Sequence, residues 1–125
     1  MRILVDTHIL LWWLGGRPVP AKGRAMISSP ENRLFVSAAS VWEVAIKSRL
    51  GRLEVDPRAF LSALATGGFE ELSVTARHAA GVAELPDHHR DPFDRLLISQ
   101  SLLESMRLLT HDRSLSEYGD AVVVV

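Results

Sequence analysis

The sequence has no cysteine, no long hydrophobic run and almost no net charge. Without cysteine the chain cannot form disulfides, thiolate zinc sites or a thiol nucleophile, and this composition suits a reducing cytoplasm. Its longest apolar run, Ile9 to Leu14, is far shorter than the roughly 20 residues that cross a bilayer. Asp6 interrupts the first residues before the apolar core of a signal peptide can form. We therefore expect a cytoplasmic protein with no membrane partner.

The formal net charge of −1, from 15 acidic and 14 basic residues, gives no general attraction to nucleic acids. This sum can conceal local separation, because Asp6 is the one acid in residues 1–30. We interpret the nearby Arg17, Lys22 and Arg24 as ordinary solvated charge. A second basic group follows further along, at Lys47, Arg49 and Arg52.

Short apolar segments alternate with amphipathic ones along the chain. Strands are expected at Ile3–Val5, Leu34–Ser37, Leu72–Val74, Leu108–Thr110 and Ala121–Val125. Helices are expected at His8–Leu14, Pro20–Ser28, Ser40–Leu50, Pro57 to the Gly67-Gly68 pair, Thr75–Glu84 and Pro92–Met106. No Asn-Gly or Asp-Gly hairpin signal occurs, so the pattern predicts an α/β fold with a parallel sheet covered by helices on both faces. The length of 125 residues fits a single domain, 1–125.

Four carboxylates stand where the predicted strands give way to helices. Asp6 follows the first strand, and Glu43 lies in the first turn expected after the second. Asp94 lies in the first turn of the last long helix, and Asp112 follows the strand Leu108–Thr110. Ligands of open parallel sheets bind outside the carboxyl ends of the strands, where the strand order reverses. We therefore expect the four acids to converge at one edge of the sheet.

Helix capping is the competing interpretation of these acids. Ser40-Val41-Trp42-Glu43 has the pattern of a capping box. Asp91 before Pro92 reads as an N-cap, although it also remains open as a fifth carboxylate near a metal. Capping explains each position but not the shared edge. Asp6 and Asp112 are less readily explained as caps than the other acids.

A cluster of carboxylates repels itself unless a cation neutralises it. Oxygen ligands without cysteine favour Mg²⁺, or Mn²⁺, over zinc or copper. Two such ions about 3.5–4 Å apart can clamp the attacking and leaving oxygens of a phosphodiester displacement. The cluster thus favours metal-dependent phosphodiester hydrolysis that needs no serine, histidine or cysteine nucleophile.

Four motifs in order along the chain resemble those of PIN-domain ribonucleases, in particular the VapC-type toxins of bacterial toxin–antitoxin pairs. The motifs are Asp6-Thr7-His8 with Leu10-Leu11-Trp12, Ser40-Val41-Trp42-Glu43 with Ile46-Lys47 and Gly51-Arg52-Leu53, Asp91-Pro92-Phe93-Asp94-Arg95 with Leu97-Ile98, and Leu109-Thr110-His111-Asp112. The resemblance implies a three-layer α/β/α sandwich with about five mostly parallel strands. It also implies a Mg²⁺-dependent endoribonuclease that acts as the toxin of a type II pair.

The resemblance assigns the catalytic and metal-binding positions to Asp6, Glu43, Asp94 and Asp112. Thr7 and Thr110 match hydroxyl positions that orient ligands. The implied partners are an RNA substrate, a second copy of the chain, a cognate antitoxin that blocks the acidic site, and operator DNA through the antitoxin complex alone. The alternative from another class is a non-catalytic PIN-fold subunit that acts through dimerisation and antitoxin binding.

Several other side chains have two interpretations. Arg95, beside Asp94, either guides an RNA backbone or is ordinary surface charge. His8, His88, His89 and His111 fit no zinc spacing, so we expect no metal ligation by them, although His8 and His111 suit a cleft lining. We expect Trp12 and Trp42 to pack and Trp13 to be partly exposed.

Overall fold

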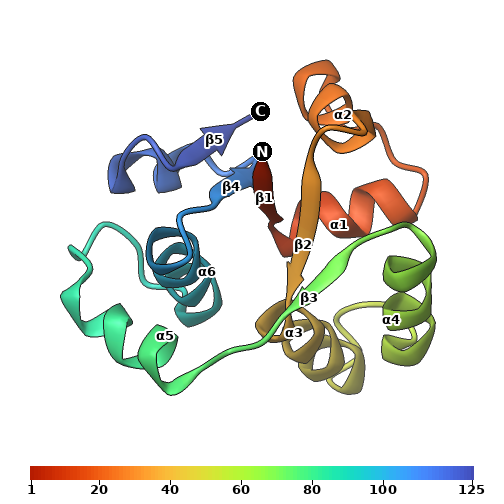
Figure 1. Cartoon of the computed structure of the whole chain (residues 1–125). Coiled ribbons are helices and arrows are strands. Elements are labelled where there is room, and N and C mark those ends of the chain that lie inside the picture. The colour runs from red at the N-terminus through yellow and green to blue at the C-terminus, as the bar shows by residue number, and fades with distance from the viewer.

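The computed structural model describes residues 1–125, and its strands form one five-stranded sheet (Figure 1). The strands are β1 (Arg2–Val5), β2 (Arg33–Ser37), β3 (Glu70–Leu72), β4 (Arg107–Thr110) and β5 (Val122–Val124). The helices are α1 (Thr7–Leu14), α2 (Ala21–Ser28), α3 (Ala38–Arg49), α4 (Pro57–Thr66), α5 (Ala76–Gly81) and α6 (Pro92–Leu103), with the 3-10 helices η1 (Val82–Glu84) and η2 (Arg113–Tyr118). Every expected element is present. β3 lies two residues earlier than predicted, and the helix expected over residues 75–84 is divided into α5 and η1.

All four strand pairings are parallel, in the order β3-β2-β1-β4-β5. The chain builds outward from β1 through β2 to β3, and then returns to place β4 on the other side of β1. The strand order therefore reverses between β1 and β4. This is where an open parallel sheet leaves a crevice at the carboxyl ends of its strands.

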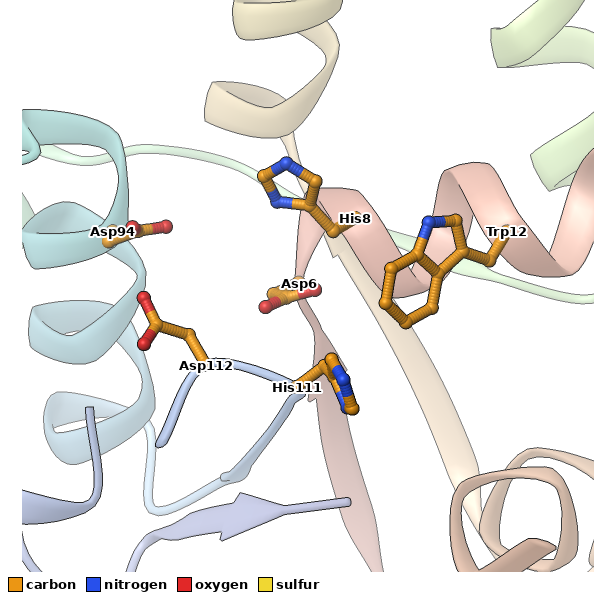
Figure 2. Close-up of a pocket in the computed structure, with 6 residues that line it drawn as sticks. All are labelled: Asp6, His8, Trp12, Asp94, His111 and Asp112. Atoms are coloured by element: carbon orange, nitrogen blue, oxygen red, sulfur yellow. The ribbon is translucent and has the colours of Figure 1, made fainter. Parts of the chain in front are cut away.

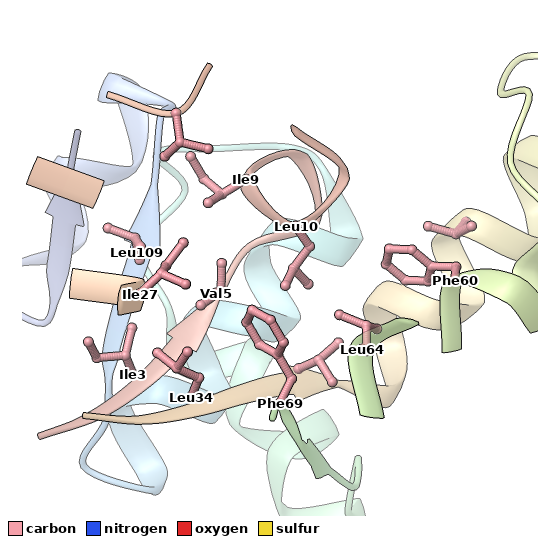
Figure 3. Close-up of a cluster of buried hydrophobic side chains, with 13 residues drawn as sticks. Ile3, Val5, Ile9, Leu10, Ile27, Leu34, Phe60, Leu64, Phe69 and Leu109 are labelled. Atoms are coloured by element: carbon pink, nitrogen blue, oxygen red, sulfur yellow. The ribbon is translucent and has the colours of Figure 1, made fainter. Parts of the chain in front are cut away.

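The sheet separates two hydrophobic clusters, because successive side chains of a strand point to opposite faces. Ile3 and Val5 belong to a cluster of 13 buried residues that also includes residues of α1, α2 and α4 (Figure 3). Leu4 belongs to a second cluster, with Leu97 and Ile98 of α6. Each fully buried aliphatic side chain contributes about 1.5–3 kcal/mol relative to exposure. The predicted three-layer α/β/α arrangement is confirmed.

The start of α3 differs from the prediction. Ser37 rather than Ser40 is the N-cap, and its hydroxyl accepts a hydrogen bond from the Ala39 N–H at 3.0 Å. The reason is that β2 passes into α3 without a loop, so the extended backbone of Ser37 already has the conformation that an N-cap needs. The expected capping box is therefore absent, and Glu43 lies in the second turn of α3 instead of the first.

Other helix ends agree with the sequence. Asp91 caps α6 ahead of Pro92 and accepts hydrogen bonds from the N–H groups of Phe93 and Asp94, at 2.8 and 3.2 Å. Gly51 follows the end of α3 with a positive φ of 71°, a conformation that favours glycine. None of the helices has the length and apolar character needed to cross a membrane.

Candidate active site

A cavity of about 210 Å³ opens at the carboxyl ends of β1 and β4, where the strand order reverses. It is lined by Asp6, His8, Trp12, Asp94, His111 and Asp112 (Figure 2). Three of the four predicted acids thus converge from three separate parts of the chain. His8 and His111 line the cavity, as the sequence suggested.

Asp6 is the most buried of these acids, with a relative exposure of 4%. Its Oδ1 accepts a hydrogen bond from the Ile9 N–H at 2.9 Å, so Asp6 caps α1. The Thr110 hydroxyl donates to Oδ2. Burial raises the pKa of Asp6, although these two hydrogen bonds oppose the shift. Asp6 is a carboxylate fixed by the backbone, with little solvent to stabilise its charge.

Asp94 faces the same cavity from the first turn of α6. Its carboxylate accepts no hydrogen bond from the protein, and His89 Nε2 lies 3.7 Å from its Oδ2. Burial raises the pKa of Asp94 to about 7, and repulsion from Asp91, Asp6 and Glu43 adds to the shift. Asp94 is therefore the acid whose charge is least compensated within the protein.

Asp112 follows β4 after one intervening residue, His111, and caps η2. Its Oδ1 accepts hydrogen bonds from the Ser114 N–H and hydroxyl, at 2.9 and 2.7 Å, and these bonds lower the pKa of Asp112. The expectation that Asp6 and Asp112 are poorly explained as caps is wrong, since both cap a helix. A carboxylate has about four acceptor sites, so it can cap with one oxygen and still face the cavity with the other.

His89 joins the acids although sequence spacing gave it no role. Its Nε2 lies 3.3 Å from Asp112 Oδ2, and the geometry of His89, Asp94 and Asp112 could enclose a metal ion. Its Nδ1, however, accepts a hydrogen bond from the Asp91 N–H at 3.1 Å. The ring proton then lies on Nε2, which donates to Asp112 rather than offering a lone pair to a metal. We assign His89 as a donor to the acids, a role visible in the sequence only through its position beside the α6 cap.

The fourth predicted acid, Glu43, lies beside the cavity rather than in its lining. Its electrostatic influence reaches Asp6 and Asp94, whose pKa values it raises. Its Oε2 is paired with Lys47 Nζ at 2.8 Å, one helical turn further along α3. Thr7 Oγ1 donates to Ser40 Oγ at 2.9 Å and so joins the α1 corner to α3.

Thr110 and Arg95, also predicted as site residues, contact the acids or the residues around them. Thr110 donates to Asp6 and accepts a hydrogen bond from the Asp112 N–H at 3.1 Å, so one hydroxyl positions two acids. The Arg95 guanidinium lies within hydrogen-bond distance of four backbone carbonyls in residues 82–89 and of the Tyr118 hydroxyl. Arg95 therefore anchors the loop that carries His89, and its donors are engaged within the protein.

Trp12 and Trp13 lie as expected, and Trp42 does not. Trp12 is partly buried and contacts His111 edge to face, with ring centroids 5.1 Å apart. Trp42 was expected to pack but is 60% exposed, because it lies on the outer side of α3, where one partner is Phe93 at 5.3 Å. Trp13 is partly buried.

The sequence matches the model of the PIN domain over residues 3–121. The chain belongs to the PIN-domain family. The motifs that carried the resemblance are therefore confirmed as those of a PIN domain. No curated protein matches the sequence.

Solved structures share this PIN fold along their whole length. A chain of the VapBC2 complex from Rickettsia felis, bound to a DNA fragment from its promoter, has a TM-score of 0.72 and 14% identity, with 100% of this chain and 98% of that chain covered. A toxin–antitoxin complex from Klebsiella pneumoniae has a TM-score of 0.70 and 21% identity over 98% and 96%. VapC20 of Mycobacterium tuberculosis, a toxin that cleaves the sarcin-ricin loop, has a TM-score of 0.60 and 20% identity over 94% and 95%. At these identities the similarity is one of fold.

Proposed function

We propose that this PIN domain is a divalent-metal-dependent endoribonuclease and the toxin of a type II toxin–antitoxin pair. The observation that carries the proposal is the convergence of Asp6, Asp94 and Asp112 on one cavity at the reversal of strand order. The geometry supports this function better than a purely structural role for the acids, because capping leaves Asp94 without any hydrogen bond to its carboxylate.

The residues of the cavity fit a hard divalent cation. Burial raises the pKa of Asp6 and of Asp94, and no lysine or arginine lines the cavity to neutralise them. A divalent ion removes that electrostatic cost, and carboxylate oxygens are ligands that Mg²⁺ and Mn²⁺ accept. Asp6, Asp94 and Asp112 would hold the ion, with Glu43 completing the site from α3.

When bound, the ion supplies charge neutralisation and activates water for in-line attack on a phosphodiester. The protein's own contribution is to fix the ligands before substrate arrives. The Thr110 hydroxyl holds Asp6 and Asp112 in register, and the α1 cap prevents rotation of Asp6. Trp12 and His111 lie on one side of the cavity, across from Asp94 and Asp112 (Figure 2). His89 contacts Asp112 at 3.3 Å.

The proposed partners follow from the neighbours in fold. Two of the similar structures are toxin–antitoxin complexes, which favours a protein antitoxin as the natural inhibitor of this chain. The presence of promoter DNA in one of them favours operator binding through the antitoxin complex. We include a homodimer and an RNA substrate in the same proposal.

The decisive experiment is cleavage of labelled RNA by the purified protein with Mg²⁺ or Mn²⁺. We expect the wild type to cut RNA, and both EDTA and Asp6→Asn to abolish cutting. Asp120→Asn is the matched control, because Asp120 is exposed and lies outside the acidic cavity. Cleavage by Asp6→Asn or in EDTA at the wild-type rate would refute the metal–carboxylate mechanism. Metal binding without cleavage of any RNA would instead support the non-catalytic alternative.

A further inference from the structure

A second cavity, of about 360 Å³, adjoins the acidic one and shares His8 and Trp12 with it. Its charged lining is mostly basic, with Arg17, Lys47 and Arg52 against Glu43. We call it the basic cavity. Its size lies at the lower end of the roughly 300–1,000 Å³ typical of ligand sites, which suits a ligand as small as one nucleotide.

We propose that the basic cavity binds the nucleotide adjacent to the phosphate that is cut, with the phosphate on the arginines and the base on the apolar floor. This inference rests on the proposed RNA cleavage and identifies a binding site for the RNA strand next to the site of cleavage. His8 and Trp12 line both cavities, so the two cavities are adjacent and within reach of one extended strand.

Arg17 and Arg52 are the cations free to bind a phosphate. Neither forms an ion pair within the chain, whereas Lys47 is already paired with Glu43 at 2.8 Å. The Arg17 guanidinium lies over the Trp12 ring, 5.8 Å from its centroid, a contact that orients the guanidinium without consuming its hydrogen-bond donors. Arginine presents a planar fork of donors that matches phosphate oxygens.

The floor of the basic cavity is apolar. Leu11 and Val44 come from α1 and α3, while Leu53 and Val55 come from the segment between α3 and α4. That segment is fixed at its start by the hydrogen bond from the Arg52 N–H to the Lys47 carbonyl, at 2.9 Å. A nucleobase offers a flat face to such a surface, and contacts of this kind are tolerant of sequence.

Charge favours an RNA strand over a single small anion. A phosphate on the arginines would be joined through the strand to the next phosphate, which the acidic cavity receives once its carboxylates hold a cation. The acidic cavity alone repels a phosphodiester, so a neighbouring cationic subsite is what retains the strand. An acidic protein segment is the other occupant that the charge allows, and the experiment separates the two.

The test measures binding of a fluorescently labelled single-stranded RNA of about ten nucleotides, in Mg²⁺, with Asp94→Asn in every protein so that the RNA is not consumed. We expect Arg17→Ala/Arg52→Ala to weaken binding about tenfold and to lower the slope of log affinity against log salt by about 0.7 for each arginine removed. The control is Arg24→Ala/Arg58→Ala, which removes two exposed arginines outside both cavities. Both double variants should have the same unfolding temperature.

The outcomes separate this subsite from the proposed nuclease. If the two double variants bind RNA equally and with the same salt slope, or if none of the proteins binds RNA, the subsite is wrong. Displacement of bound RNA by UMP in the control but not in Arg17→Ala/Arg52→Ala supports it, while displacement by a polyglutamate peptide alone overturns it in favour of an acidic protein segment. RNA cutting by the Asp94→Asn background refutes the proposed role of Asp94 in cleavage, whereas a difference between the double variants in binding to intact RNA tests the subsite alone.

Discussion

The acidic and basic cavities lie side by side but are built from different kinds of structural element. The acids occupy strand ends and helix starts, where the backbone fixes them: Asp6 follows β1, Asp112 follows β4 and Asp94 lies in the first turn of α6. The basic cavity collects long side chains from helices and loops, with Arg17 after α1 and Arg52 after α3. Side chains that hold a metal need fixed positions, which the backbone provides. Side chains that bind a flexible RNA strand tolerate more movement, so long arginine and lysine side chains suffice.

The comparison also explains the near-zero net charge of −1. This sum averages an acidic cavity and a basic cavity that meet at His8 and Trp12. Neither cavity gives the whole protein a charge that attracts nucleic acid. Binding of an RNA strand therefore depends on the two cavities being adjacent. The comparison therefore predicts separate effects on turnover and on binding.

The largest expected effect is on the rate of RNA cleavage, and it separates the role of the acidic cavity from that of the basic cavity. Asp94→Asn should reduce kcat of RNA cleavage at least about a thousandfold, because metal charge stabilisation is worth several kcal/mol. Arg17→Ala/Arg52→Ala should raise KM about tenfold and leave kcat within about twofold. Steady-state cleavage with saturating Mg²⁺ measures both. A large fall in kcat for the arginine variant would remove the distinction between the two cavities.

The second effect concerns the stability of the metal-free protein. The fold raises the pKa of Asp94 from 3.8 to about 7, so the folded state keeps a proton that the unfolded chain has released. The stabilisation from this proton is complete below about pH 4 and is lost as the pH rises through about 7. Each pKa unit corresponds to about 1.4 kcal/mol. Because the Asp94 side chain is 22% exposed and solvent screens part of the effect, we expect the free energy of unfolding to fall by about 2–3 kcal/mol.

Thermal unfolding in EDTA from about pH 4 to about pH 8 spans both pKa values and measures this loss. Asp94→Asn should flatten the profile and be more stable than the wild type at the higher pH, and Mg²⁺ should restore the wild type there. The same pH dependence in Asp94→Asn would mean that the destabilising charge belongs to another group.

The sequence predicted the acidic cavity because backbone position determines it. A carboxylate that follows a buried parallel strand at once, as Asp6 does, or after one residue, as Asp112 does, lies at the carboxyl edge of the sheet whatever its rotamer. The sandwich followed from the same regularity, since Ile3 and Val5 face one cluster and Leu4 the other. These are consequences of strand periodicity, which a single sequence carries.

The basic cavity could be predicted only in part, because long side chains decide it. Lys47 and Arg52 belong to one basic group in the sequence, but the sequence does not show that Arg17 joins them. Arg17 was interpreted as solvated charge, yet the chain between α1 and α2 turns so that Arg17 lies over Trp12. The contact of His89 with Asp112 could not be predicted either, because a hydrogen bond from the Asp91 backbone N–H orients the His89 ring. The α3 start was missed for a related reason: the loop-free passage from β2 moves the cap to Ser37.

A smaller effect tests how firmly the backbone-placed acids depend on one hydroxyl. Thr110→Val keeps the shape of a fully buried side chain but removes the hydrogen bonds to Asp6 and from Asp112. Loss of a group that orients a metal ligand costs about tenfold or more in metal affinity. Calorimetric titration with Mn²⁺ measures it, and Thr110→Ser should recover most of the affinity. If Ser and Val variants bind Mn²⁺ alike, the hydroxyl has no positioning role.

The smallest effect concerns the residue pair that joins the two cavities. Glu43 and Lys47 both line the basic cavity, one turn apart on α3, with their charged atoms 2.8 Å apart. Glu43 also raises the pKa values of Asp6 and Asp94 in the acidic cavity. Because Lys47 is 39% exposed while Glu43 is nearly buried, we expect a coupling of about 0.5 kcal/mol, close to that of other helical pairs of this spacing. A double-mutant cycle of Glu43→Gln and Lys47→Gln in urea measures it. A coupling several times larger would mean that Lys47 chiefly serves to hold Glu43 beside the acids, and the two cavities would then have to be treated as one electrostatic unit.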